Sequence, residues 1–471
     1  MITHFVANPS TENVRLLTQP DGRNRELRSS EIAVGVIIGR MSEFFDFFVY
    51  AIAAVLVFPK LVFPFSDPFT ATAYSFAIFS LAFVARPLGT IIFTMVDQAY
   101  GRGVKLTIAL LLLGTSTVAV AFLPGYDEVG LASAFWLGLL RIGQGLSVAG
   151  AWDGLASLLA VSVPPHRRGW YAMIPQLGAT LGLILASGLF VFFASALSAE
   201  DFLDWGWRYP FLVAFAINVV ALFARLRLAM SPEFAQFFEA RQLEPTSAWE
   251  TMRTQGGKII VGTFAPLASF ALLHMVTVFP LAWVFLYTTE SPAHFLMIEI
   301  IGACIGLLTV VLSGPIADRV GRIRLLIVCA ILIGMFSCLA PELLNGGDTG
   351  ETIFMVLGFV LLGLSFGQSS GSVASHFPKS YRYTGSALTT DFAWLVGAGF
   401  APLVALMLSN YFGLIAAGAY LLSAAICTTV ALLVNVRLER KPSANRLCDN
   451  LTPKSGSARA KNALTDRDFP G

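Results

Sequence analysis

Apolar segments long enough to cross a lipid bilayer occupy most of this chain. A membrane-spanning helix needs about 20 mostly apolar residues. Segments of that kind begin near Glu31, Ala71, Gly103, Val129, Gly169, Arg208, Ile259, Phe295, Leu325, Thr352, Arg382 and Tyr411. Of the 471 residues only 13% are charged, against about 25% in soluble domains. The sequence therefore predicts an all-α membrane protein with twelve transmembrane helices.

The loops between these segments alternate in charge. One set is basic: Arg102, Lys105, Arg167, Arg168, Arg225, Arg227, Arg241, Arg253, Lys258, Arg319, Arg322, Arg324, Lys379 and Arg382. The other set is mainly acidic and includes Asp67, Asp127, Asp201 and Asp348. Because basic loops stay in the cytoplasm, we expect the first set, and with it both termini, on the cytoplasmic side.

The two halves of the chain repeat each other. Asp97 to Arg102 after the second segment matches Asp318 to Arg322 after the eighth, and Gln144 has a counterpart in Gln368. Such a duplication is typical of secondary transporters, whose solute site lies near mid-membrane between the halves. We expect a cytoplasmic N-terminal segment (1–30), a six-helix bundle (31–229), a cytoplasmic linker with a short interfacial helix (230–258), a pseudo-symmetric second bundle (259–436) and a disordered cytoplasmic tail (437–471).

The fourth apolar segment carries an arginine, Arg141, and farther along it Trp152 and Asp153. A charge at membrane depth is costly, so it faces a partner or a watery cavity and marks a transport path. Gly145 and Gly150 remove side-chain bulk and allow a neighbouring helix to approach closely. The alternative is that Arg141 only pairs with a neighbour and fixes the bundle.

The first apolar segment has a polar face formed by Arg40, Glu43, Asp46 and Tyr50, which fall within an arc of about 120° on a helix. Intramembrane acids commonly relay protons, so we expect Asp46 or Glu43 to carry a coupling proton. The alternative is a structural Arg40–Glu43 pair, with Asp46 serving as a bond between helices.

Further charged residues are predicted at membrane depth. Three cations (Arg40, Arg86, Arg141) face four acids (Glu43, Asp46, Asp153, Asp391). If all are buried, one acid has to be neutralised by a proton, which favours proton coupling. Glu299 is interpreted as interfacial, and His274 either relays protons or is a polar residue that is hydrogen-bonded or faces the pore. The candidate substrate contacts are Arg40, Arg86, Arg141, Trp152, Asp153, Gln176 and Asp391.

The sequence shows no P-loop, zinc-ligand spacing or nucleophile elbow, and its five cysteines have no CxxC spacing. We therefore expect neither an enzyme nor an ATP-driven pump, and no cofactor, metal or nucleic-acid partner. The expected driving force is the proton gradient.

Several motifs together resemble the major facilitator superfamily, and more narrowly its metabolite:proton symporter branch, which includes carriers for oxoglutarate, shikimate, citrate and proline or betaine. They are SEFFDFFVY (42–50), ARPLGTIIF (85–93), RIGQGLSVAG (141–150), PPHRRGWY (164–171), GWRYPF (206–211) and RLRLAMSPEF (225–234). The resemblance implies a coupling role for Arg141 and proton or solute handling by the acids of the first segment. It also implies a cytoplasmic gate formed by Asp97, Gly101, Arg102, Asp318, Arg319, Gly321 and Arg322.

Two departures from the family pattern affect these expectations. The first gate loop has Gln98 where the family has a basic residue. The fourth segment has Ala151 where relatives have an acid, and Asp153 lies two residues farther along, a rotation of about 200° on the helix. Asp153 therefore cannot replace the missing acid in place.

These features predict a proton-coupled symporter that carries a small mono- or dicarboxylate by alternating access and works as a monomer in the bacterial inner membrane. A buried arginine can hold a carboxylate through two hydrogen bonds. One alternative is a zwitterion such as proline or betaine, held by Phe44, Phe47 and Trp152. A non-transporting nutrient sensor on the same fold is another, which the short polar tail disfavours.

Overall fold

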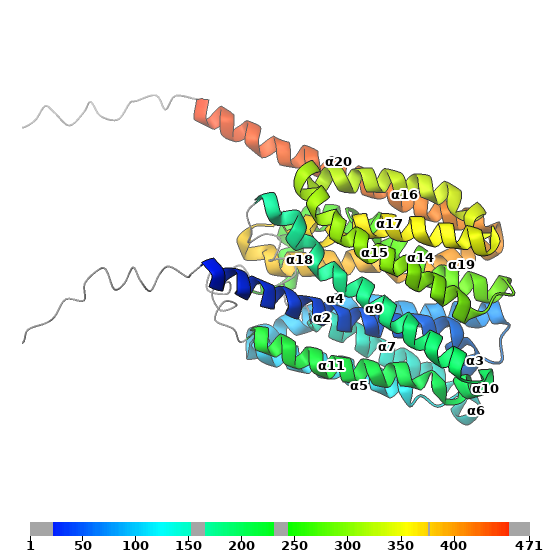
Figure 1. Cartoon of the computed structure of the whole chain (residues 1–471). Helices are drawn as coiled ribbons and strands as arrows, with labels where there is room; N and C mark the ends of the chain where they lie inside the picture. Colours follow the sequence, from blue (N-terminus) through cyan, green and yellow to red (C-terminus); the bar gives the residue numbers. More distant parts are fainter. Residues whose placement is uncertain (1–21, 152–164, 230–243, 375–376, 452–471) are drawn as a thin grey trace, which may run out of the picture.

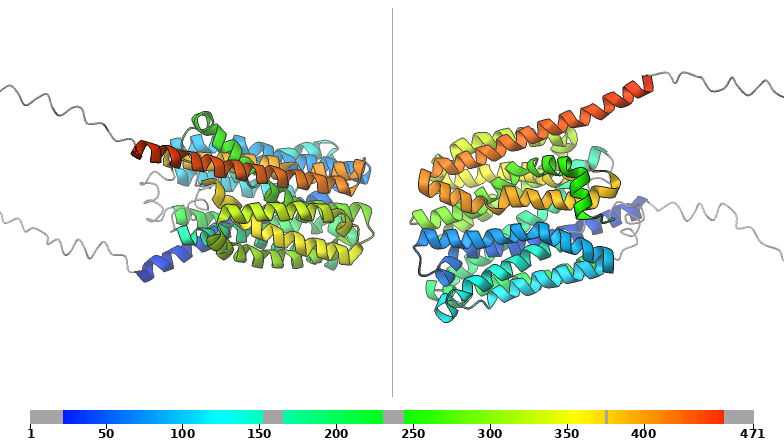
Figure 2. Two further views of the ribbon diagram at one scale, coloured as in Figure 1. Left: turned by 90° about the horizontal axis from the view of Figure 1, so that it is seen from above. Right: turned by 180° about the vertical axis from the view of Figure 1, so that it is seen from behind.

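The computed structural model describes residues 22–151, 165–229, 244–374 and 377–451. These residues form helices and short connections, with no β-strand among them. The long helices run side by side along one direction in two layers, with the first half of the chain below the second (Figure 1). The view from behind shows the same two layers (Figure 2).

The first half contains six long helices. They are α2 (Gly22–Leu56), α4 (Pro68–Tyr100), α5 (Arg102–Ala121), α7 (Ala132–Gly150), α9 (Arg168–Ala196) and α11 (Arg208–Ala229). Short turns connect them: α3 (Phe58–Val62), α6 (Tyr126–Val129), η1 (Pro165–Arg167), α10 (Ala199–Asp201) and η2 (Phe202–Gly206). Asp67 begins α4 by accepting a hydrogen bond from the Thr70 amide at 3.0 Å, which supplies a partner for a helix-terminal N–H group.

The second half repeats this plan with two broken spans. Its helices are α13 (Ala248–Phe264), α14 (Leu267–Tyr287), α15 (Pro292–Val320), α16 (Arg322–Leu344), α17 (Gly347–Ala374), η3 (Lys379–Tyr381), α18 (Arg382–Trp394), η4 (Leu395–Gly399), α19 (Ala401–Phe412) and α20 (Leu414–Leu451). α13 and α14 form the seventh span. α18 and α19 form the eleventh, interrupted by the π-helical turn η4, a feature frequent at functional sites.

All twelve predicted spans coincide with these helices, so the predicted fold is confirmed. Judged by length and composition, ten helices within the described ranges are long and apolar enough to cross a membrane. The remaining two spans are α2 and α7, which hold Arg40, Glu43, Asp46 and Arg141. The polar residues of the candidate site thus account for their weaker hydropathy.

The expected boundaries differ from the helix bounds at three places. α2 begins at Gly22, inside the stretch assigned to the N-terminal segment, and α13 begins at Ala248, inside the stretch assigned to the linker. α20 continues to Leu451, inside the stretch assigned to the tail. The interfacial helix expected from Ser231 lies outside the described residues.

Helix contacts repeat between the halves. In the first half α4 packs on α7 and α5 on α11, and the equivalent pairs in the second half are α15 with α17 and α16 with α20. The halves meet where α9 packs on α15, α2 on α14, and α4 on α18 and α19. This pseudo-symmetry puts α2, α4 and α9 at the boundary between the halves.

Close helix contact at Gly145 and Gly150 is confirmed. A Cβ built on Gly145 would lie 2.2 Å from the Ala82 carbonyl oxygen of α4, and one on Gly150 would lie 2.5 Å from the Phe93 ring. Atoms cannot approach that closely, so α4 and α7 can adopt this spacing only with glycine there.

Two predicted placements are wrong. Arg225, assigned to a cytoplasmic loop, lies in α11 and is 5% exposed. Arg225 lies in the last turns of α11, on the side of this helix that faces Glu43 and the end of α7. Glu299, interpreted as interfacial, is 1% exposed and accepts a hydrogen bond from Ser187 of α9 at 3.3 Å. It is buried because α15 packs along α9 over much of its length.

Candidate functional site

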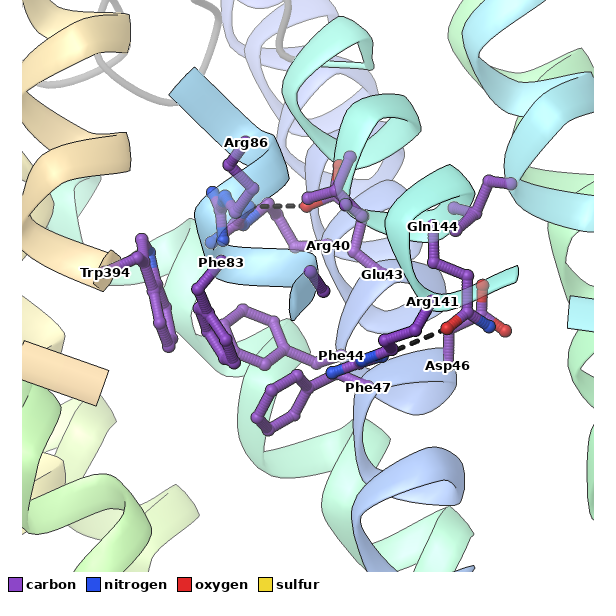
Figure 3. Close-up of a pocket in the computed structure, with 14 residues that line it drawn as sticks. Arg40, Glu43, Phe44, Asp46, Phe47, Phe83, Arg86, Arg141, Gln144 and Trp394 are labelled. Carbon is purple, nitrogen blue, oxygen red and sulfur yellow. Dashed lines mark hydrogen bonds and ion pairs between the residues drawn. The ribbon is translucent and has the colours of Figure 1, made fainter. Parts of the chain in front are cut away.

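A cavity of about 60 Å³ lies inside the first half and is closed on one side by the second. Its wall comes from α2, α4, α5 and α7, and Trp394 of α18 covers it (Figure 3). Each water needs about 10–15 Å³ of such a cavity, so there is room for about four waters. A larger solute requires the two halves or the aromatic side chains to move apart.

Arg141 lies in this cavity wall and is 3% exposed. It donates to the Phe79 carbonyl oxygen at 3.2 Å and to Oε1 of Gln144 at 3.0 Å. Its guanidinium also stacks on the Tyr50 and Phe79 rings, 4.0 and 4.7 Å from their centroids. Within the described part of the chain, it has no ion pair with a carboxylate. The positive charge is held by neutral and aromatic groups, as suits a residue that receives an anion.

Asp46 is buried beside Arg141, and among the described residues it accepts hydrogen bonds only from neutral donors. Its Oδ2 accepts from Asn218 at 2.7 Å and from Thr117 at 3.2 Å. Its Oδ1 is buried and has no hydrogen-bond partner among the described residues. Gln144 accepts from Arg141 at 3.0 Å (Figure 3) and donates to Thr117 at 3.0 Å, so a chain of polar groups connects the arginine to this carboxyl.

Glu43, the other predicted proton carrier, is held by two arginines. One of its oxygens lies 2.5 Å from Arg40 and the other 2.5 Å from Arg225. Arg225 also donates to the Ala151 carbonyl oxygen at 2.8 Å, and so ties α11 to the end of α7. Two close cations strongly favour the charged form of a carboxylate. Glu43 therefore has the contacts of the structural alternative, whereas Asp46 has the free oxygen that a proton carrier needs.

Arg86 and Asp391 connect the two halves. Their closest atoms, Nε and Oδ1, are 3.3 Å apart, and Thr90 of α4 donates to the other oxygen of Asp391. The guanidinium of Arg86 lies 5.4 Å from the centre of the Trp394 ring. A solute that competes for Arg86 would weaken this link between α4 and α18.

The predicted surplus of one deep acid stays a prediction, because Asp153, like Trp152, lies outside the described residues. Within those residues Arg225 adds a fourth deep cation and Glu299 a fourth deep acid, so the two signs balance there. The case for a proton site therefore depends on the surroundings of Asp46, which only neutral groups contact directly among the described residues.

Aromatic side chains that the sequence analysis did not single out line the boundary between the halves. Trp394 stacks on Phe270 with ring centres 4.5 Å apart and on Phe83 at 6.3 Å. His274 of α14 lies among Phe47, Phe79 and Phe83, and both of its ring nitrogens are buried without a hydrogen-bond partner in the described part of the chain. The break at Leu395–Gly399, directly after Trp394, was the available signal, since a Gly-rich stretch interrupts that span.

Gln176 of α9 lines a second cavity of about 30 Å³ together with Arg40 and Trp394. Its Oε1 is buried and has no partner among the described residues. Arg40 and Trp394 line both cavities, so they form the partition between them.

The first predicted gate loop contacts the second half through Tyr383 of α18. Lys105 donates to the Tyr383 hydroxyl at 2.6 Å, and this hydroxyl donates to Asp97 at 3.5 Å. Asp97 pairs with Lys105 at 3.2 Å. Arg102 stacks over the Tyr383 ring, 5.0 Å from its centroid, and Gly101 at φ 81° turns the chain between α4 and α5.

The second predicted gate loop, in the second half, contacts the start of α9 in the first half. Asp318 of α15 accepts hydrogen bonds from the backbone amides of Gly169 and Trp170 at 2.6 and 3.1 Å, and so caps the start of α9. Arg322 donates to the Arg168 carbonyl oxygen at 3.2 Å, and Gly321 has φ 97°. Arg319 is exposed. Each copy of the loop therefore bridges to the opposite half.

Comparisons with known proteins agree with this architecture. The family model described as "Major Facilitator Superfamily" matches residues 36–402. The chain is 36% identical to the inner membrane metabolite transport protein YhjE of Escherichia coli K12, over 86% of this chain and 93% of that protein. The shikimate transporter of the same organism is 30% identical over 85% and 93%, and its proline/betaine transporter 28% identical over 91% and 87%.

Among solved structures, a D-xylose–proton symporter superposes with a TM-score of 0.65 at 19% identity, covering 86% of this chain and 96% of that one. Two bundles with bridged gate loops and a charged central cavity define a secondary transporter rather than an enzyme. The chain belongs to the major facilitator superfamily, in its metabolite transporter branch.

Proposed function

We propose that this protein is a proton-coupled symporter of a small mono- or dicarboxylate in the bacterial inner membrane. The observation that carries this proposal is the pairing of two residues in the described part of the chain: Arg141, a buried cation without a carboxylate partner there, and Asp46, a buried carboxyl with one oxygen that has no partner there. A carboxylate solute supplies the anion that Arg141 lacks, and a proton supplies the donor that Asp46 Oδ1 lacks.

The coupling follows from the chain of contacts between these two residues. A solute carboxylate on Arg141 draws its guanidinium from Gln144, which is also the donor to Thr117 beside Asp46. Binding on one side therefore changes the hydrogen bonds on the other. With Asp46 protonated and the solute charge neutralised, the cavity carries less net charge, which lowers the cost of closing the two halves around it.

The rival function is transport of a zwitterion such as proline or betaine. Phe44, Phe47, Phe83 and Trp394 give the cavity an aromatic side, and aromatic faces bind quaternary amines. Trp152, which the sequence analysis put in this box, lies outside the described residues. Trp394 provides an aromatic wall in the described part.

Uptake of labelled solutes into proteoliposomes, with and without an imposed pH gradient, tests the proposal. We expect accumulation of at least one carboxylate when the lumen is alkaline, and none when a protonophore collapses the gradient. Saturable betaine uptake that carboxylates do not inhibit would refute the organic-acid assignment. Carboxylate accumulation that is indifferent to the pH gradient would refute proton coupling.

A further inference from the structure

A cluster of carboxylates and a histidine lies at the end of the second half opposite the gate. Glu290 lies in the connection between α14 and α15, His294 in the first turn of α15 and Asp348 in the first turn of α17. One ligand atom of each lies within 4.8 Å of the others. α15 has 29 residues and ends at Val320, directly before Gly321 of the predicted gate, so the cluster is about 43 Å from the gate along that helix.

Glu351, one turn after Asp348, points into the same cluster. It is 1% exposed, and its carboxyl interacts with Glu290, Asp348 and His294. Its Oε2 is buried without a hydrogen-bond partner in the described part of the chain, and so is Oε2 of Glu290. Within that part, no Lys or Arg forms an ion pair with these carboxylates. Buried carboxylate oxygens without a donor are costly, and a cation between them would remove that cost.

The backbone around the cluster is fixed by local hydrogen bonds. The Ser291 hydroxyl accepts from the His294 amide at 3.1 Å, and the Thr288 hydroxyl accepts from the Glu290 amide at 3.3 Å. The His294 ring already meets Asp348, with Nε2 and Oδ1 2.8 Å apart. These contacts fix the backbone at Glu290 and His294 and the His294–Asp348 side-chain pair before any ligand arrives, which lowers the cost of binding one.

We propose that Glu290, His294, Asp348 and Glu351 bind a divalent transition-metal ion of the zinc class. An imidazole with carboxylates suits zinc, whereas magnesium and calcium prefer oxygen ligands alone. The ion neutralises the facing carboxylates and joins the α14–α15 connection to the start of α17. This site is independent of the central cavity and of the solute carried there.

Calorimetric titration of ZnCl2 into the full-length chain in lipid nanodiscs, tag-free and pretreated with a chelator, tests the site. We expect one saturable zinc per chain, with MgCl2 binding more weakly. Asp348→Asn and His294→Gln change exposed side chains, and each should weaken zinc binding at least about tenfold. Binding should also weaken as the pH falls and protonates the histidine.

His166→Gln and Glu342→Gln are the matched controls, since both side chains are exposed and lie outside the cluster. They should bind zinc like the wild type. The proposal is overturned if the wild type shows no saturable zinc binding, if both cluster variants bind like the wild type, or if the control variants lose as much affinity as the cluster variants.

Discussion

At the scale of single residues, the decisive contrast is between Asp46 and Glu43, three residues apart on α2. The sequence placed both on the polar face and left the choice between them open. It could not show that Arg225, 182 positions away in the chain, turns inward to bind Glu43, because the loop charge pattern assigns that arginine to the cytoplasm. Contacts between distant spans therefore decide which acid is available to carry a proton.

Asp46→Asn should abolish solute accumulation driven by a pH gradient, because an amide cannot exchange the proton. Counterflow of solute should survive, since Asn can keep the bonds to Thr117 and Asn218 after rotation. Both are measured in proteoliposomes. Asp67→Asn is the control: the Thr70 amide holds the pKa of Asp67 below its usual range, and Asn caps a helix equally well. Accumulation by the Asp46 variant in response to pH would contradict the assignment.

Arg141→Lys should distinguish the two candidate solutes. A lysine cannot reproduce the two-pronged contact of arginine with a carboxylate, and losing one charged hydrogen bond costs about 1.5–3 kcal/mol. Carboxylate affinity, measured by inhibition of uptake, should fall at least about tenfold. Trp394→Leu should instead weaken a betaine, which needs the aromatic face. If Arg141→Lys left carboxylate affinity unchanged, Arg141 would not be a solute contact.

At the scale of helices, the sequence predicted the spans well, because the length of an apolar run limits where a membrane helix can lie. It also predicted the close contacts at Gly145 and Gly150, because a missing side chain can be seen in the sequence itself. It did not predict the π-helical turn after Trp394 or the inward side of Arg225. The glycines of Leu395–Gly399 mark a break in that span, but the form of the turn and the inward side of Arg225 depend on packing against helices that are distant in the sequence.

Gly145→Ala tests the close contact between α7 and α4. The added Cβ would lie 2.2 Å from a backbone oxygen, so the helices have to separate, which costs about 1–3 kcal/mol. We expect a lower melting temperature in detergent. Gly138→Ala on the same helix is the control, because its Cβ would meet Leu81 at an ordinary 3.5 Å. Equal melting temperatures for both variants would show that the helices do not approach this closely.

Asp97→Asn tests the gate between α4 and α18. The change removes the charge that Lys105 pairs with and weakens the link to Tyr383. The carrier should then favour the state open toward the gate. A single cysteine at Ser369, beside the second cavity, should react faster with a maleimide when native cysteines are replaced. Asp127→Asn, exposed at the opposite end, should leave the rate unchanged. An unchanged rate in Asp97→Asn would exclude this gate role.

At the scale of the whole molecule, the repeat in the sequence predicted two bundles and the ends at which the loops lie. One end of the molecule holds Asp127 in α6, Asp201 in α10 and Asp348 in the first turn of α17. Lys105 and the start of α18 lie at the other end, where the gate loops are. The basic residues of the gate loops should keep that end in the cytoplasm. Reporter fusions after Asp127, Asp201 and Asp348 should therefore report the outside of the inner membrane. Fusions after Lys105, Glu244 and Lys379 should report the inside. The reverse pattern at two or more sites would contradict this topology, because the gate would then face the outside and the metal cluster the cytoplasm.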